Sequence, residues 1–80
     1  MIIIMNERVL DILQEIRPDV DFQAEEKLID DGILDSFDIV SIVGDLNDAF
    51  SIDISVDELV PENFNTLGAI CDLVEKMINE

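Results

Sequence analysis

The chain has 80 residues, enough for one small domain, and we expect a single domain over residues 1–80. Hydrophobic residues make up 49% of it, which excludes an intrinsically disordered protein, and aromatic residues only 5%, so the core must be aliphatic, as in small helix bundles. The formal charge of −16, from 20 acidic and 4 basic residues, excludes nucleic acid and anionic membrane surfaces as partners.

The first expected element is a helix from about Ile3 to Ile16. Its apolar residues recur at helical spacing, and Pro18 ends the pattern. These apolar residues are Met5, Val9, Ile12, Leu13 and Ile16. The apolar run that opens the chain is shorter than the ~20 residues of a membrane span, and it lacks the basic residues of a signal peptide. We therefore expect a cytoplasmic protein with no membrane insertion.

A long connection is expected from Pro18 to Asp35. Its apolar residues indicate that it packs onto the body of the protein, with a short helical turn near Ala24–Leu28. These apolar residues are Val20, Phe22, Leu28, Ile29, Ile33 and Leu34. Gly32 would supply a positive φ angle where a turn of this connection needs one.

The second helix is expected from about Ser36 to Phe50, and it has two distinct faces. At about 100° per residue, an apolar stripe is formed by Ile39, Val43, Leu46 and Phe50, with Ile42 and Val40 beside it. The opposite face carries Asp38, Ser41, Asp45 and Asp48. Phe37 and Gly44 lie at the edge of this polar face.

The last third of the chain predicts one loop, one turn and one helix. Residues 51–56 alternate apolar and polar side chains, but no partner strand is evident, so we expect an extended loop that places its isoleucines in the core. A single helical turn should follow over Val56–Val60 and stop at Pro61. Thr66 then caps a last helix that runs to about Met77. Its inward face is expected to consist of Leu67, Ile70, Cys71, Val74 and Ile78.

Together these elements predict an all-α fold. It is a small four-helix bundle of three longer helices and one short one, with a long first loop.

Few residues of the chain could support catalysis. There is no His, the usual general base and metal ligand at neutral pH, and Ser36 has no activating partner nearby other than carboxylates. One Cys cannot build a zinc site or an internal disulfide, and Cys71 has apolar neighbours at helical spacing, so we expect it to be buried. The spacing of an EF-hand calcium loop is absent. We expect neither an enzyme nor a metal site.

The acidic charge is unevenly distributed. Between Leu28 and Glu75 every charged residue is Asp or Glu. Such a field attracts proteins with basic patches, and self-repulsion favours a monomer that salt stabilises. The alternative interpretation is that the acidic surface serves only to keep the protein in solution.

The tetrad Asp35-Ser36-Phe37-Asp38 opens the second helix. A serine at a helix N-terminus is well placed to carry a phosphate, because backbone N–H groups and the helix dipole favour negative charge there. Asp and Ser are also common helix caps, so an ordinary cap is the alternative.

Two runs of the chain resemble the acyl carrier protein family. They are Leu28-Ile29-Asp30-Asp31-Gly32-Ile33-Leu34-Asp35-Ser36-Phe37-Asp38, before an acidic amphipathic helix, and Phe50-Ser51-Ile52-Asp53-Ile54, before an acidic turn and Thr66-Leu67. The resemblance covers most of the chain. It implies a carrier rather than a catalyst, with Ser36 esterified by 4′-phosphopantetheine that a phosphopantetheinyl transferase donates from coenzyme A. The thiol of this arm would hold an acyl or aminoacyl group as a thioester.

In that family, basic patches on the loading enzyme and on downstream transferases bind the second helix. The resemblance therefore assigns a docking role to Asp35, Phe37, Asp38, Ser41, Asp45, Asp48, Asp57 and Glu58. Phe37 would be an exposed apolar contact or, alternatively, a hydrophobic staple against Ile33 or Leu34. We expect Asp38→Lys and Asp45→Lys to weaken docking without unfolding the domain.

The cargo remains open. The leading interpretation is an acyl intermediate of lipid, polyketide or related biosynthesis. The stretch Asp31–Phe37 is closer to D-alanyl and other stand-alone aminoacyl carriers of cell-wall modification or peptide synthesis, and Ser41 and Gly44 depart from fatty-acid carriers. A long acyl chain would need a cavity lined by Ile39, Ile54, Leu59 and Ile70, for which core packing is the preferred role. An unmodified acidic helical adaptor is the third interpretation.

Overall fold

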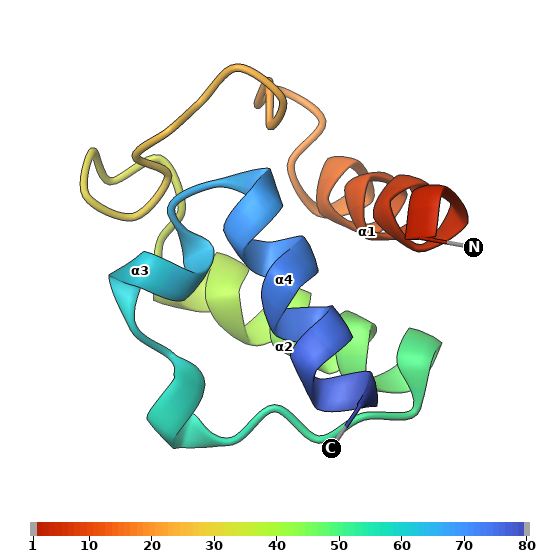
Figure 1. The fold of residues 1–80 in the computed structure, drawn as a ribbon. Coiled ribbons are helices and arrows are strands. Elements are labelled where there is room, and N and C mark those ends of the chain that lie inside the picture. Colours follow the sequence, from red (N-terminus) through yellow and green to blue (C-terminus); the bar gives the residue numbers. More distant parts are fainter. Residues whose placement is uncertain (1, 80) are drawn as a thin grey trace.

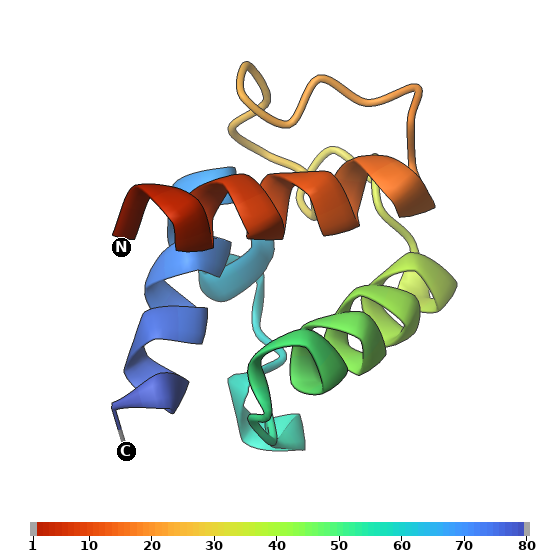
Figure 2. The ribbon, with the colours of Figure 1, turned by 90° about the vertical axis from the view of Figure 1, so that its right-hand side faces the viewer.

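The structure is a computed structural model that describes residues 2–79. Its helices are α1 (Ile2–Ile16), α2 (Ser36–Phe50), α3 (Pro61–Phe64) and α4 (Leu67–Ile78), with one 3₁₀ turn, η1 (Val56–Glu58). α1 packs against both α2 and α4, and α3 packs against α4 (Figures 1 and 2). The predicted all-α bundle with three longer helices and a long first loop is confirmed. No helix within residues 2–79 is both long and apolar enough to cross a membrane.

The ends of the longer helices lie where caps and prolines predict them. α2 begins at Ser36 after the N-cap Asp35, and it ends at Phe50. The C-cap Ser51 adopts a left-handed conformation (φ 54°) and donates its N–H to the carbonyl of Asn47. α4 begins after Thr66, whose Oγ1 accepts a hydrogen bond of 2.9 Å from the N–H of Ala69. Each cap satisfies a backbone group that the helix itself leaves without a partner.

The core lies where α1, α2 and α4 meet, and the loops contribute to it. Its fully buried side chains are Val9 and Leu13 of α1, Ile42 and Leu46 of α2, Phe64 of α3, Ile70 and Val74 of α4, and Phe22 and Leu28 of the long first loop. Burial of Cys71 and Ile54 is confirmed. Burial of Leu73 was not predicted.

Two residues predicted to lie on or beside apolar stripes are exposed. Val40 is 69% exposed and Ile78 is 47% exposed. Val40 stands at the edge of the α2 stripe, beyond the part that faces α1 and α4, and Ile78 is the last residue of α4. Helical periodicity gives the direction of a side chain but not how far the neighbouring elements extend, so it cannot predict exposure at such margins.

The long first loop is held in place by backbone and amide hydrogen bonds. Asn65, at the junction of α3 and α4, accepts the N–H groups of Ile29 and Asp30 with its Oδ1 atom, at 3.0 and 3.1 Å. Gly32 has the predicted positive φ angle, 71°. The helical turn expected near Ala24–Leu28 lies earlier, because the N–H groups of Ala24 and Glu25 both bond to the carbonyl of Asp21.

The segment after α2 corrects one prediction. Residues 52–55 form no strand, as expected, and η1 forms the expected turn. Pro61, however, begins α3 instead of only ending that turn. At the first position of a helix the absent N–H of proline costs no hydrogen bond, and its fixed φ angle suits the helix.

Candidate functional site

The N-terminus of α2 places the Ser36 side chain at the surface, on a well-defined turn. Asp35 and Asp38 form a reciprocal capping box: the N–H of Asp38 donates to Asp35 Oδ1 at 2.9 Å, and the N–H of Asp35 donates to Asp38 Oδ2 at 3.1 Å. Ser36 lies between them as the first helical residue and is exposed. Its hydroxyl is therefore accessible, and its backbone is fixed on both sides.

Arg17, just after the end of α1, contacts this turn directly. Its Nη1 atom donates to Asp38 Oδ2 at 2.7 Å and to the carbonyl of Ile33 at 2.9 Å. Its Nε and Nη2 atoms bind both oxygens of Asp19, at 3.0 and 2.9 Å. The Asp19 contact and then the Asp38 contact raise the pKa of Arg17, and the Arg17 hydrogen bond lowers the pKa of Asp19.

No sequence pattern had singled out Arg17. It is separated from Asp38 by 21 residues, and neither helical spacing nor a turn motif links the two positions. The signal available was only that it is one of 4 basic residues and directly precedes Pro18 at the end of α1.

An open apolar groove adjoins Ser36. One hollow of about 460 Å³ is lined by Ile29, Leu34, Asp35, Ser36, Ile39, Val40 and Leu59. A second, of about 220 Å³, shares three of these residues and continues along Val60, Pro61 and Phe64. We call the two together the Ser36 groove. It runs from the N-terminus of α2 toward α3, so a substituent on the serine has an apolar surface beside it.

The structure separates the four residues considered as walls of an acyl cavity. Ile54 and Ile70 are buried in the core, at 6% and 0% exposure. Ile39 and Leu59 line the Ser36 groove at the surface. Core packing is thus the role of the first pair, whereas the second pair lines an open surface groove.

Phe37 points into solvent. Its side chain is 83% exposed, so the hydrophobic-staple interpretation is wrong. Together with Val40 it gives the exposed side of α2 an apolar patch next to Ser36. Exposure of a large aromatic side chain is unfavourable unless a partner covers it, and such residues are typical of binding surfaces.

The acidic residues assigned to docking fall into two groups. Asp35, Asp45, Asp48 and Asp57 are exposed, as is Ser41. Asp38 and Glu58 are instead engaged within the protein, with side chains only 15% and 22% exposed. Glu58 binds Lys76 at 2.9 Å and accepts hydrogen bonds from Asn63.

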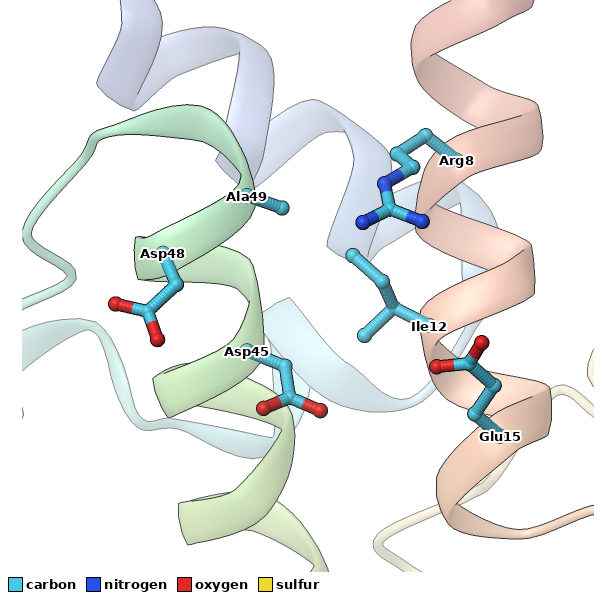
Figure 3. Close-up of a pocket in the computed structure, with 6 residues that line it drawn as sticks. All are labelled: Arg8, Ile12, Glu15, Asp45, Asp48 and Ala49. Atoms are coloured by element: carbon cyan, nitrogen blue, oxygen red, sulfur yellow. The ribbon is translucent and has the colours of Figure 1, made fainter.

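Asp45 and Asp48 line a shallow hollow between α2 and α1. Arg8, Ile12 and Glu15 form its α1 side, and Asp45 points toward that helix in Figure 3. The ion pairs found among residues 2–79 involve Arg17 and Lys76, so both carboxylates remain available to a partner. The described part of the chain contains no cluster of three His, Cys, Asp or Glu side chains suited to a metal ion.

Comparison with known proteins identifies the family. Residues 7–74 match the family model described as the phosphopantetheine attachment site. The chain belongs to this family of carrier proteins. It is similar to D-alanyl carrier proteins of Lactobacillus acidophilus (36% identical over 73 residues, 90% of this chain and 92% of that protein) and Streptococcus suis (32% over 76 residues, 94% and 96%). No solved structure matches the chain.

Family membership confirms two expectations. The chain is a carrier that enzymes modify and act on, and not itself a catalyst. Its prosthetic group is covalently bound phosphopantetheine. The α2 N-terminus fits such a group: the only side chain needed is an exposed hydroxyl, and the Ser36 groove leaves room beside it. When bound, the group supplies a thiol on a flexible arm, while the protein supplies its attachment and presentation.

Cys71 is not a second thiol for this purpose. It is 5% exposed, and burial raises its pKa to about 11, so it is a neutral, inaccessible side chain of the core.

Proposed function

We propose that Ser36 carries the 4′-phosphopantetheine arm and that the arm transports an aminoacyl group, D-alanine, as a thioester. The observation that supports the attachment point is the exposed hydroxyl at the start of α2, within a capping box that presents it to solvent. The D-alanyl carrier proteins to which the chain is similar support the cargo. An acyl intermediate of lipid or polyketide synthesis is the competing cargo.

The chemistry at Ser36 is a phosphoryl transfer. The Ser36 oxygen forms a P–O bond, the pyrophosphate bond of coenzyme A breaks, 3′,5′-adenosine bisphosphate leaves, and the hydroxyl proton passes to the transferase. The new phosphodiester carries one negative charge. The N–H groups at the start of α2 favour that charge, whereas Asp35 and Asp38 oppose it. Arg17 balances part of this opposition through its ion pair with Asp38.

The attachment point is tested by incubating the pure protein with coenzyme A and a broad-specificity phosphopantetheinyl transferase and measuring the intact mass. We expect a single pantetheinyl increment that Ser36→Ala abolishes. Ser41→Ala is the matched control, because Ser41 is an exposed serine of the same helix. A folded wild type that takes up no mass would contradict the proposal and favour an unmodified acidic adaptor.

The cargo is tested by charging the modified protein. Transfer of D-alanine by an adenylating ligase supports the aminoacyl carrier. Failure with that ligase, together with loading by a malonyl transferase, would favour the acyl intermediate over D-alanine as the cargo.

We propose further that the exposed face of α2 is the docking surface for the loading enzyme. Its acidic residues Asp45 and Asp48 and the apolar Phe37 would meet a basic patch with an apolar contact beside it. We expect Asp45→Lys to weaken binding of the ligase, and Asp11→Lys, the same charge change at an exposed position of α1, to weaken it less. Equal losses in both variants would mean that only net charge matters.

A further inference from the structure

We propose that Arg17 is a positioning residue for the modification of Ser36. It ties the end of α1 to the turn on both sides of the serine and so holds the hydroxyl in the orientation that the transferase requires. This inference rests on the proposed attachment at Ser36.

One nitrogen atom, Nη1 of Arg17, makes both contacts with the turn. Asp38 Oδ2 accepts Arg17 Nη1 at 2.7 Å and also accepts the N–H of Asp35 at 3.1 Å. The same Nη1 atom donates to the carbonyl of Ile33 at 2.9 Å. The residues before and after Ser36 are therefore held by a single guanidinium, whereas the Ser36 hydroxyl itself has no hydrogen bond within residues 2–79. Its position depends on this backbone.

Arg17 is itself firmly held. Its N–H bonds to the carbonyl of Leu13 at 2.9 Å, at the end of a helix whose side chains Val9 and Leu13 are fully buried. Both carboxylate oxygens of Asp19 accept hydrogen bonds from the other edge of the guanidinium. The rigid core thus sets the location of the turn through Arg17. A lysine could replace it only in part, because an ammonium group lacks the planar fork that reaches both Asp19 and the Asp38–Ile33 side.

Placement of the nucleophile matters because phosphoryl transfer depends on positioning and charge stabilisation more than on covalent chemistry by the protein. A displacement of about 1 Å lowers the rate of a well-aligned reaction by up to ~100-fold. Arg17 also offsets part of the charge of Asp38, which would otherwise repel the incoming phosphate. Its side chain is only 29% exposed, so it acts through the turn and not as a docking contact.

The first test is the steady-state rate of pantetheine transfer to the apo protein with coenzyme A and a broad-specificity transferase. We expect Arg17→Ala to lower kcat on the order of tenfold, without raising KM for the carrier, because the variant is more acidic and attracts a basic enzyme more strongly. Arg17→Lys should restore only part of kcat. Arg8→Ala is the matched control: it removes the same charge from α1 at an exposed residue with no ion pair in the described structure.

The second test is amide hydrogen exchange, measured by NMR on the same variants. We expect Arg17→Ala to reduce protection of the Asp35 amide, which donates to Asp38, while the amide of Leu46 in the middle of α2 remains protected. A purely structural role would lower both protections together and would reduce kcat only in proportion to the folded fraction.

The outcomes separate the two proposals. If the wild type is modified and Arg17→Ala has the kcat of Arg8→Ala, the role of Arg17 is overturned and the attachment at Ser36 stands. If the wild type is not modified, the proposed function fails, and with it the role of Arg17 in modification. A tenfold loss of kcat with unchanged KM and unchanged Leu46 protection supports the inference.

Discussion

Asp38→Lys distinguishes a docking residue from a structural one. The sequence predicts that this change weakens docking and leaves the domain folded. In the structure, however, the Asp38 carboxylate is 15% exposed, binds Arg17 at 2.7 Å and accepts the N–H of Asp35 at 3.1 Å. A lysine there loses both contacts and places a second cation beside Arg17. We therefore expect the variant to be destabilised, and this expectation replaces the earlier one.

The size of the effect follows from the two contacts. Loss of the capping-box hydrogen bond costs about 1 kcal/mol. Loss of a charge-assisted hydrogen bond costs about 1.5–3 kcal/mol, and exposure of 29% of the Arg17 side chain allows water to offset part of it. A total of about 2–3 kcal/mol corresponds to a decrease in Tm of roughly 10–20 °C for a domain of this size.

Thermal and urea unfolding followed by far-UV circular dichroism measures this decrease. Asp45→Lys is the control, since it makes the same charge change on the same helix at an exposed carboxylate with no internal partner in the described structure. It should melt at or slightly above the wild-type Tm because it reduces net repulsion. A double-mutant cycle of Arg17→Ala and Asp38→Ala should give a coupling energy above about 0.5 kcal/mol. Equal Tm values for the two lysine variants, or no coupling, would refute the reasoning.

Three further predictions concern stability and the buried thiol. Added NaCl should raise the Tm of the wild type, because it screens self-repulsion in a chain of net charge −16; a flat or falling Tm would contradict this. Gly44→Ala should stabilise α2 by up to ~1 kcal/mol, since the added Cβ meets no other atom. Gly32→Ala should destabilise the protein by about 1 kcal/mol, because φ is 71° there. Urea unfolding that ranks the stabilities of the two variants in the opposite order would contradict this reasoning from backbone conformation. The raised pKa of Cys71, about 11, means that stability should fall as pH rises from about 9 toward 11, because only the unfolded state readily loses the proton. Cys71→Ala should flatten that slope, and rapid reaction of the native thiol with a disulfide reagent at pH 8 would disprove burial.

Much of the fold could be predicted because the signals are local. The bounds of α2 follow from Asp35, Ser36 and a 3.6-residue apolar period, and those of α4 from the Thr66 cap. Gly32 could be assigned its positive φ angle from residue type alone. These effects act over one or two helical turns, so they can be predicted from residues that are close together in the sequence.

The predictions that were wrong concern residues whose environment depends on a neighbouring element of the fold. Pro61 can end one helix or begin the next, and the structure adopts the second arrangement as α3. Phe37 had two possible environments, and the turn before α2 leaves it 83% exposed instead of packed as a staple. Val40, beside the apolar stripe of α2, and Ile78, at the end of that of α4, are exposed because burial depends on how far the neighbouring elements extend.

The sequence by itself determined that a serine with flanking carboxylates opens a helix, in a chain whose acidity suits basic partners. Only the tertiary structure decided which carboxylates remain available. Asp38 and Glu58 form ion pairs with Arg17 and Lys76, 21 and 18 residues away, while Asp45 and Asp48 remain at the surface. An ion pair forms where packing brings two distant segments within about 4 Å, and no local pattern along the chain encodes that distance.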